Sequence, residues 1–268
     1  RRAVRLGSPC RVPSRASWEI GKSLVDQFLE SQLKVKGQYP RKVGFSLSSF
    51  ATFQDFGVME AQILYLLGVR PAWDKQNLVA DVELIPAREL QRPRVDVFIA
   101  VDGYYRDVLP SRIQLIDKAV RLVADAKGEG NVIHDSCERV RAELEKSGID
   151  AVRSRSLSRA RLFGYAPGEF SNAGYYYLVE RSGQWANRED LMKVYLAHVR
   201  YAYTEGLWGV SAPEAYDRHI QGTEAVLRSW SDRTRSPLSN KYDWWTGGSL
   251  ALAPAADGAV SRAPPAVP

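Results

Sequence analysis

Cysteine is scarce in this sequence of 268 residues, which contains only Cys10 and Cys137. Two cysteines cannot build a disulfide framework, and such sparse use is typical of a reducing cytosol. No uninterrupted apolar run approaches the ~20 residues that a membrane-spanning helix needs. The N-terminal segment also lacks the apolar stretch of a secretory signal. These absences predict a soluble, cytoplasmic globular chain without a membrane span.

The net charge is also low over most of the chain, although the total is +6. Residues 1–15 hold five arginines and no acidic residue, whereas residues 16–253 are almost neutral. Nucleic-acid binding requires an extended basic surface on the folded body. We therefore expect no nucleic-acid partner. Residues 1–15 and 254–268 show no hydrophobic periodicity and are predicted to be disordered tails.

Residues 16–130 are predicted to form an α/β domain. Apolar runs that are typical of buried strands occur at 43–47, 69–73, 82–85 and 94–101. Helical periodicity occurs after Ser17, which is the expected N-cap of a first helix, over 52–67 and from Pro110 onward. This order of strands and helices favours a mostly parallel sheet with helices on both faces.

Residues 131–253 are predicted to form a mainly helical region with few strands. The expected helices cover 131–147, 150–163, 174–182, 187–203 and 211–230. The predicted fold class is therefore α/β, with a parallel-sheet half followed by a mainly helical half.

Two short motifs resemble ligand sites without the required context. Ala16–Ser23 matches a relaxed phosphate-loop pattern, but no strand precedes it and its apolar residues fit an amphipathic helix. We interpret this match as fortuitous, and a nucleotide-binding α/β domain remains a weaker alternative. His134 and Cys137 have a spacing that one metal ion could bridge, but a structural zinc site needs four ligands. We interpret that pair as surface residues of a helix.

The segment Asp102–Asp107 is the first candidate site, because it follows the strongest predicted strand. Ligands of open parallel sheets bind at the carboxyl ends of the strands. The segment combines a glycine with two acids, Arg106 and the rings of Tyr104 and Tyr105. Such a composition at such a position predicts a ligand-facing loop.

A cluster of arginines and two aromatic stretches are further candidates. Four arginines lie within residues 153–161 without an acid, which suits either a solvated helix face or a clamp for carboxylates. Residues 165–170 and 174–177 are rich in glycine and aromatics, which suits either a core or a platform for a flat, apolar ligand. His198 and His219 lie among tyrosines, and each is either structural or catalytic.

Several blocks of the sequence resemble the family of cobaltochelatase large subunits and magnesium chelatase H subunits. The blocks lie at Gly68–Pro71, Arg92–Val97, Gly103–Asp107, Leu115–Arg121, Arg161–Gly164, Tyr201–Tyr203 and Tyr242–Gly248, with single matches at Gly168, Trp185 and Tyr195. The resemblance covers about residues 16–252. Members of that family are far longer, so the chain resembles an internal or truncated fragment of the large subunit.

The resemblance implies ATP-dependent insertion of a divalent metal into a tetrapyrrole, the activity of a ligase that forms nitrogen–metal bonds. Cobalt insertion into a corrin precursor, in cobalamin biosynthesis, is the preferred expectation. Magnesium insertion into protoporphyrin is the alternative, and a non-catalytic tetrapyrrole-binding or docking module is an alternative of another class. The metal is a substrate. Separate AAA+ partner subunits are expected to use ATP, which this chain is not expected to bind, and the fragment alone is expected to be inactive.

Two departures from the family pattern concern its acidic residues. The family has Glu directly after a helix glycine, where this chain has Val58 after Gly57, with Glu60 two residues further on. Near the family's C-terminal end, an acidic and histidine-bearing run is replaced by Ser231–Ser236.

The resemblance and the motifs together nominate two sets of site residues. Expected catalytic groups, which would handle protons or the metal, are Glu60, Asp102, Asp107, His198 and His219. Expected substrate-binding groups are Tyr104, Tyr105, Arg106, Arg159, Arg161 and Arg233.

Overall fold

The fold is known from a computed structural model that describes residues 9–126, 131–170 and 188–229. Six strands form one sheet in the order β7-β6-β5-β4-β1-β8. They are β1 (Lys42–Leu47), β4 (Asp96–Val101), β5 (Leu162–Gly164), β6 (Tyr201–Thr204), β7 (Leu207–Ser211) and β8 (Ala225–Leu227). Strands β5, β4, β1 and β8 are parallel, and β6 and β7 extend the sheet as antiparallel strands. The predicted α/β fold class with a mostly parallel sheet is confirmed.

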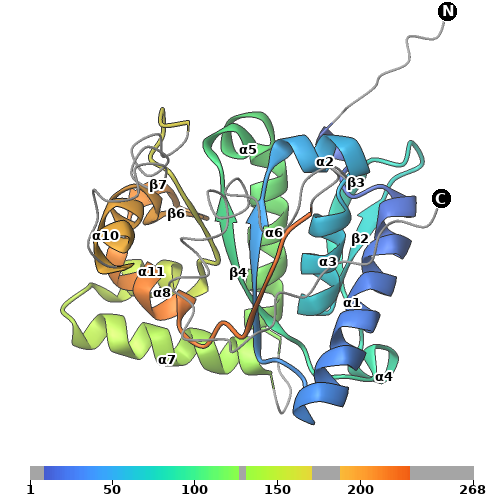
Figure 1. The fold of residues 1–268 in the computed structure, drawn as a ribbon, viewed down its shortest axis with the longest axis horizontal. Coiled ribbons are helices and arrows are strands. Elements are labelled where there is room, and N and C mark those ends of the chain that lie inside the picture. Colours follow the sequence, from blue (N-terminus) through green and yellow to red (C-terminus); the bar gives the residue numbers. More distant parts are fainter. Residues whose placement is uncertain (1–8, 127–130, 171–187, 230–268) are drawn as a thin grey trace, which may run out of the picture.

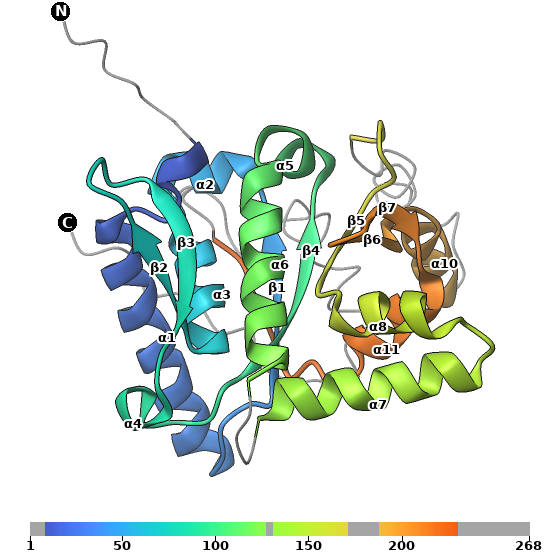
Figure 2. The same ribbon diagram turned by 180° about the vertical axis from the view of Figure 1, so that it is seen from behind.

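Helices surround this sheet, and a separate antiparallel pair of strands lies beside it (Figures 1 and 2). The pair is β2 (Val69–Trp73) and β3 (Val79–Leu84). The helices are α1 (Arg15–Lys36), α2 (Ser49–Asp55), α3 (Val58–Leu67), α4 (Ala87–Leu90), α5 (Gly103–Val108), α6 (Pro110–Ala124), α7 (Val132–Lys146), α8 (Ala151–Arg159), α10 (Arg188–Val199) and α11 (Pro213–Ile220), and η1 (Pro9–Arg11) is a 3-10 turn. Among the described residues, none of these helices is long and apolar enough to cross a bilayer.

Strands β1 and β4 form the centre of the core. All six residues of β1 are buried, and five of the six in β4 are buried. A strand that is covered on both faces reads as a continuous apolar run, which is why both strands are recognisable in the sequence. Helix α3 packs between α1 and α6, and it also contacts β4. The contact of α1 with α3 is so close that a Cβ on Gly21 would lie 2.6 Å from the Cβ of Ala61.

The N-terminal segment confirms one expectation and differs from two others. Ala16–Ser23 lies inside α1, which confirms its interpretation as helix rather than phosphate loop. The cap of α1 is Ser14 and not Ser17, because the Ser14 side chain accepts the hydrogen bond from the Ser17 N–H. Val12 is buried and its carbonyl accepts a hydrogen bond from Arg112 Nη1 at 2.6 Å, so residues 9–15 are packed rather than loose.

The expected helix over 52–67 is wrong in one respect, because two helices occupy this range. Helix α2 ends at Phe56 and Gly57, which both adopt left-handed backbone conformations with φ of 55° and 93°. Helix α3 begins at Val58, and the Asp55 side chain accepts hydrogen bonds from the N–H groups of Gly57 and Val58 at 2.9 and 3.1 Å. Glu60 therefore lies in the first turn of a new helix.

The second half of the chain contains more strand than expected. Helix α7 agrees with the prediction, but the expected helices over 150–163, 187–203 and 211–230 each end early. Strands β5, β6, β7 and β8 follow and join the sheet of the first half. These strands are three to five residues long, too short for a period-2 pattern to be distinguished from a buried helix turn. The division of the chain near residue 130 stays a prediction, and 174–182 lies outside the described residues.

Candidate ligand site at the carboxyl edge of the sheet

Four parallel strands end at the same edge of the sheet, at the top in Figure 1, and three of them lead into the site. Strand β1 leads into Ser48 and α2, and β4 leads into Asp102 and α5. Strand β8 leads into Arg228 and Ser229. Loops at the carboxyl ends of parallel strands are the usual place for a ligand in an open α/β sheet. This edge is therefore the candidate site.

Asp102 connects β4 to α5 as a helix cap. Its Oδ1 accepts a hydrogen bond from the Tyr105 N–H at 2.5 Å. Burial raises the pKa of the Asp102 carboxyl above its usual value. The segment predicted as a loop is in fact a short helix. Its first residue must be glycine, because a Cβ on Gly103 would lie 2.2 Å from the carbonyl oxygen of Glu169.

Exposed aromatic rings from three segments meet at this edge. The Phe50 ring of α2 is parallel to the ring of Tyr104, with centroids 5.5 Å apart. The ring of Phe170 also lies beside that of Tyr104, with centroids 5.9 Å apart and planes tilted by 39°. Phe50 and Phe170 are 66% and 60% exposed, which is unusual for such large apolar rings. We call these three residues the aromatic shelf.

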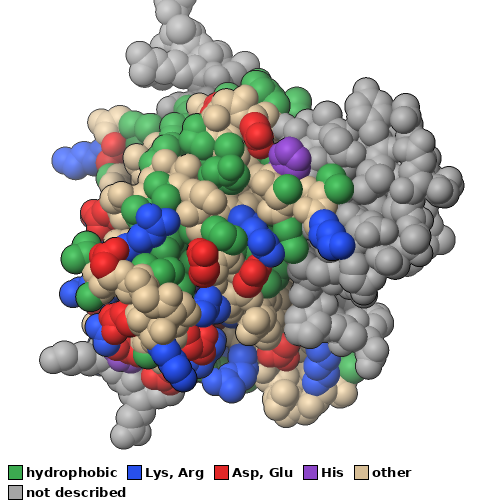
Figure 3. Space-filling view, turned by 90° about the vertical axis from the view of Figure 1, so that its left-hand side faces the viewer, with side chains coloured by type: hydrophobic (Ala, Val, Ile, Leu, Met, Phe, Trp, Pro, Cys, Tyr) green, Lys and Arg blue, Asp and Glu red, His purple; other side chains and the backbone are tan. Residues whose placement is uncertain are grey.

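The exposed side chains at the top of the molecule differ in type from those below. In Figure 3, which faces the α10 side, hydrophobic side chains gather toward the top, at the level of α2 and α5 in Figure 1. Acidic and basic side chains are mixed below them. This distribution agrees with the nearly neutral charge of the body, and it places the apolar surface at the carboxyl edge.

A buried carboxyl group lies beneath α2 and α5. Glu60 is 1% exposed, and its Oε1 is 2.7 Å from Thr52 Oγ1 and 2.8 Å from the hydroxyl of Tyr105. Its Oε2 is buried and has no hydrogen-bond partner among the described residues. Burial raises the pKa of Glu60 and raises that of Tyr105 well above its usual value. Glu60 is thus a group that holds a proton readily.

The hydrogen bonds of Thr52 fit a neutral Glu60. The Thr52 hydroxyl is also 3.2 Å from the carbonyl oxygen of Ser48, but its one hydrogen can serve only one acceptor. If Glu60 carries the proton, it donates to Thr52, which donates in turn to Ser48. A chain of hydrogen bonds then runs from Glu60 to the carboxyl end of β1.

Arg106, Asp107 and His198 lie around the loop that carries Phe170. Arg106 is 3% exposed, donates to both oxygens of Asp107, and bonds the carbonyls of Tyr165 and Ala166. Asp107 is half-exposed, and His198 Nδ1 lies 3.4 Å from Glu169 Oε2. Arg106 thus anchors the loop, while Asp107 and His198 face solvent at its rim.

The structure places three other predicted site residues at the opposite edge. Arg161 is fully buried and its Nε donates to Asp96 Oδ1 at 2.7 Å, at the start of β4. His219 is fully buried, with Nδ1 3.1 Å from Arg161 Nη1, and burial lowers its pKa well below the usual value. Arg159 pairs with Asp125 at the end of α6. Since β4 rises about 3.3 Å per residue, the two edges are about 20 Å apart. Arg233 lies outside the described residues.

Some residues of the edge were not found by sequence reasoning. Phe50 was missed because it precedes the expected helix over 52–67, and Thr52 was missed because it was taken as the start of that helix. Ser229, whose hydroxyl donates to Asp55 Oδ2 at 3.2 Å, was missed because β8 was not recognised. Burial raises the pKa of Asp55, so a second carboxyl group of perturbed acidity lies beside Glu60. The apolar spacing of the phenylalanines at 50, 53 and 56 was the available signal.

The described part of the chain contains no cluster of three or more His, Cys, Asp or Glu side chains placed to hold one metal ion. The carboxylates and the histidine at the edge lie singly or in pairs around the shelf. The arrangement can hold protons and can support a flat apolar ligand from below.

Comparisons with known proteins agree with the observed fold. A family model described as CobN/Magnesium Chelatase matches residues 8–263. The aerobic cobaltochelatase subunit CobN of Pseudomonas aeruginosa is 36% identical over 245 residues, which are 90% of this chain and 19% of that protein. The chloroplastic magnesium-chelatase subunit ChlH of Oryza sativa subsp. japonica is 31% identical over 236 residues, 87% of this chain and 16% of that protein.

A solved structure shares the fold at a similar level of identity. The catalytic subunit of cobaltochelatase from Mycobacterium tuberculosis superposes with a TM-score of 0.81 and 32% identity. The match covers 91% of this chain and 20% of that one. The chain thus spans about a fifth of the length of the relatives it matches.

Proposed function

Because the chain belongs to the CobN/Magnesium Chelatase family, we propose that it is part of the large, tetrapyrrole-binding subunit of an ATP-dependent metal chelatase. The metal is the substrate, and partner AAA+ subunits hydrolyse the ATP. The observation that carries this proposal is the aromatic shelf lying above a buried carboxyl group at the carboxyl edge of the sheet. A tetrapyrrole is flat and apolar at its centre, so rings such as those of Phe50 and Tyr104 suit its face.

The buried carboxyl group suits the chemistry of metal insertion. A free tetrapyrrole must lose two ring N–H protons before four nitrogens can bind a divalent ion. A carboxyl group of raised pKa can release its own proton to solvent and then take up a ring proton in the same pH range, and Glu60 has the required burial and partners. Asp107 and His198, exposed at the rim, would exchange those protons with solvent or guide the incoming metal.

We propose cobalt as the metal and a corrin precursor as the acceptor, which makes the enzyme a ligase of cobalamin biosynthesis. The supporting observation is that the quoted cobaltochelatase subunit is 36% identical, against 31% for the quoted magnesium-chelatase subunit. Magnesium and protoporphyrin are the alternative. A non-catalytic binding module is a second candidate, because Val58 stands where the family pattern has Glu.

Removing rings of the shelf should weaken tetrapyrrole binding by the 268-residue chain. Each aromatic contact contributes about 0.5–1.5 kcal/mol beyond its buried area, so we expect Tyr104→Ala and Phe50→Ala each to weaken binding severalfold. The measurement is a titration of porphyrin and corrin precursor followed by the absorbance of the ligand itself. ATP is titrated by calorimetry in a separate arm.

The control variant for that titration is Trp208→Ala. Trp208 is an exposed aromatic residue of β7 whose ring contacts that of Tyr203, which is not a residue of the shelf. It should leave the affinity unchanged. Equal loss in all three variants would place the ligand elsewhere, and binding of ATP without binding of a tetrapyrrole would overturn the proposed function.

Asp107 and His198 should matter for turnover in the full-length subunit assembled with its ATPase partners. We expect Asp107→Ala and His198→Ala each to lower metal insertion at least tenfold, because each removes a group that can accept a proton at the rim. The assay compares cobalt with magnesium, which also decides between the two metals. Asp125→Ala is the matched control, since Asp125 is likewise an exposed carboxylate paired with an arginine but lies at the opposite edge. Rates equal to the wild type would remove both residues from the site.

A further inference from the structure

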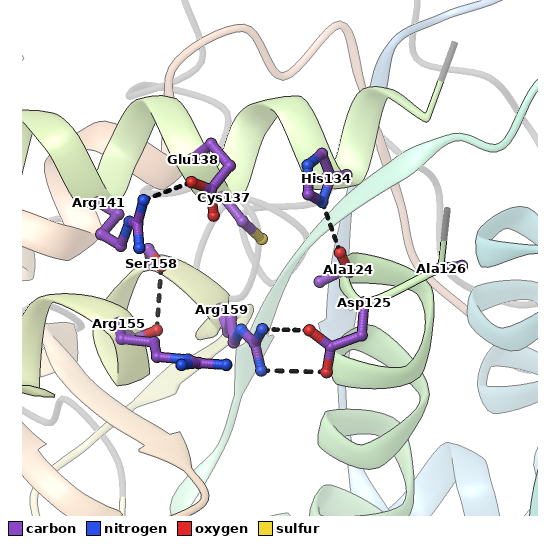
Figure 4. A pocket seen from close by; sticks show the side chains of 10 residues that line it. All are labelled: Ala124, Asp125, Ala126, His134, Cys137, Glu138, Arg141, Arg155, Ser158 and Arg159. Carbon is purple, nitrogen blue, oxygen red and sulfur yellow. Dashed lines mark hydrogen bonds and ion pairs between the residues drawn. The ribbon is translucent and has the colours of Figure 1, made fainter. Parts of the chain in front are cut away.

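A cavity of about 480 Å³ lies at the amino edge of the sheet, away from the aromatic shelf. It is bounded by the C-terminal end of α6 and by α7 and α8 (Figure 4). Its lining is mainly polar and includes Asp125, His134, Glu138, Arg141, Arg155 and Arg159. The proposed chelatase function does not use this cavity, because about 20 Å separates the two edges of the sheet.

Three guanidinium groups line the cavity from two helices. Arg141 extends from α7 and donates to Glu138 at 2.6 Å, and Arg159 of α8 pairs with both oxygens of Asp125. Arg155 has no acidic partner among the described residues, and Figure 4 shows its side chain extending from α8 along the cavity. Three cations thus face two carboxylates.

Arg155 and Arg159 lie four residues apart on one helix, so their side chains share a face. Like charges at this spacing destabilise a helix, unless an anion lies between them. Asp125 satisfies only two of the five N–H donors of Arg159, and the other donors stay available. The helix face therefore offers two guanidinium groups to one ligand.

Further positive charge lies behind the wall of the cavity. Cys137 Sγ accepts a hydrogen bond from Arg161 Nη2 at 3.5 Å. Behind it, Arg161 and Lys42 are both buried around the single carboxylate of Asp96. The cations thus outnumber the carboxylates in the wall as well as in the lining. A concave site with charge of one sign concentrates the field and attracts a ligand of the opposite sign.

Two of the lining side chains are held in place before any ligand binds. His134 Nδ1 hydrogen-bonds the carbonyl oxygen of Ala124 at 2.7 Å, which orients its ring, and no partner of Nε2 occurs among the described residues. The pair with Asp125 fixes the fork of Arg159. Prior ordering lowers the entropy that binding must overcome.

We propose that this cavity is a second ligand site, which binds a small organic dianion such as a phosphate ester or a dicarboxylate. Arg155 and Arg159 bind the anionic group from one side, and Arg141 and His134 complete the site from α7. Guanidinium forks bind phosphate and carboxylate oxygens bidentately, which suits this chemistry better than a halide or a neutral ligand. The volume lies in the range of small-molecule pockets, so the ligand is larger than a bare inorganic ion.

The test is a calorimetric titration of the 268-residue chain at constant ionic strength. Glycerol 2-phosphate and succinate are the two probes, and the one that binds identifies the class of dianion. We expect Arg155→Gln to weaken binding at least tenfold and Arg155→Lys, which keeps the charge but not the fork, to weaken it less. Arg155 is exposed, and thermal unfolding of each variant checks that the fold is retained.

The matched control is Arg88→Gln, the same change at an exposed arginine of α4. It should leave the affinity unchanged. The proposal is overturned if neither probe binds the wild-type chain, or if Arg88→Gln weakens binding as much as Arg155→Gln.

Discussion

Replacing Asp96 with Ala should lower the free energy of unfolding by about 3–5 kcal/mol, the usual loss when one partner of a buried ion pair is removed. Asp96 accepts from Nε and Nη2 of Arg161 at 2.7 and 3.2 Å, and the two side chains are 3% and 0% exposed. Arginine keeps its proton, so the variant retains an uncompensated buried charge. Urea denaturation of the 268-residue chain measures the loss.

Lys42 adds a pH dependence to that loss. Burial lowers the pKa of Lys42 to about 8, and Asp96 at 4.0 Å opposes this effect. Without Asp96, the pKa of Lys42 falls further, and the folded state binds fewer protons than the unfolded state over a wider range. Stability rises with pH where the unfolded state binds more protons. The loss in Asp96→Ala relative to the wild type should therefore shrink as the pH rises toward about 8 and stay constant above it, where both chains gain stability alike.

The matched control for Asp96→Ala is Asp125→Ala. Asp125 also pairs with an arginine through both oxygens, but it is 58% exposed, so we expect a loss of at most about 1 kcal/mol. If Asp96→Ala does not fold, Asp96→Asn keeps the shape and should lose less. Equal losses in Asp96→Ala and Asp125→Ala would contradict a structural role of the buried pair.

The buried pair shows why arginine spacing alone could not separate the site from the core. Four arginines between residues 153 and 161 appear as one cluster in the sequence. In the fold, Arg161 is fully buried and pairs with Asp96, which lies 65 residues away in the sequence. Arg155 of the same cluster is exposed. A partner so distant in sequence leaves no local pattern that could be recognised.

Part of the carboxyl edge could be predicted, because the strand before it has a strong local pattern. The run that forms β4 is apolar and β-branched, so both the strand and the position of Asp102 after it could be predicted. Strand β8 has three residues and pairs with β1 from the other end of the chain, so neither it nor Ser229 could be placed. Strong local periodicity determined what could be recognised.

The surroundings of Glu60 depend on one backbone feature. A continuous helix over 52–67 would place Thr52 and Glu60 about 12 Å apart along its axis, too far for a hydrogen bond. The left-handed Phe56 and Gly57 instead end α2, and α3 begins at Val58. This break lets Thr52 of one helix reach Glu60 of the next at 2.7 Å. Helical periodicity continues across the break, and so it concealed the site.

Replacing Glu60 with Gln should lower metal insertion by the full-length subunit about 10²–10⁴-fold, the usual contribution of a positioned proton acceptor. Gln keeps the shape of the side chain and can still accept from the Tyr105 hydroxyl, but it cannot take a proton. Insertion is measured with the partner ATPases present, and Glu83→Gln, at an exposed position of β3, is the control. A wild-type rate in Glu60→Gln would exclude Glu60 from proton handling.

A stability measurement tests the protonation of Glu60 independently of catalysis. The raised pKa means that the folded chain holds this proton above pH 4.5, where the unfolded chain begins to release it. Wild-type stability therefore falls as pH rises from about 4.5 through the folded pKa, with a slope of at most about 1.4 kcal/mol per pH unit for one proton. Glu60→Gln lacks this loss, so its stability relative to the wild type should increase with pH over that range.

The change with pH in the stability difference between Glu60→Gln and the wild type tests whether Glu60 is protonated. The size of that difference at a single pH does not. Gln leaves a buried amide group at the place of Oε2, which has no partner among the described residues, and this lowers stability equally at every pH. Asp55 and Asp102 also have raised pKa values, but they are present in both chains, so their effects largely cancel in the difference. Parallel curves for Glu60→Gln and the wild type would mean that Glu60 is ionised in the fold. A rising difference, absent in Glu83→Gln, would show a stored proton beneath the aromatic shelf.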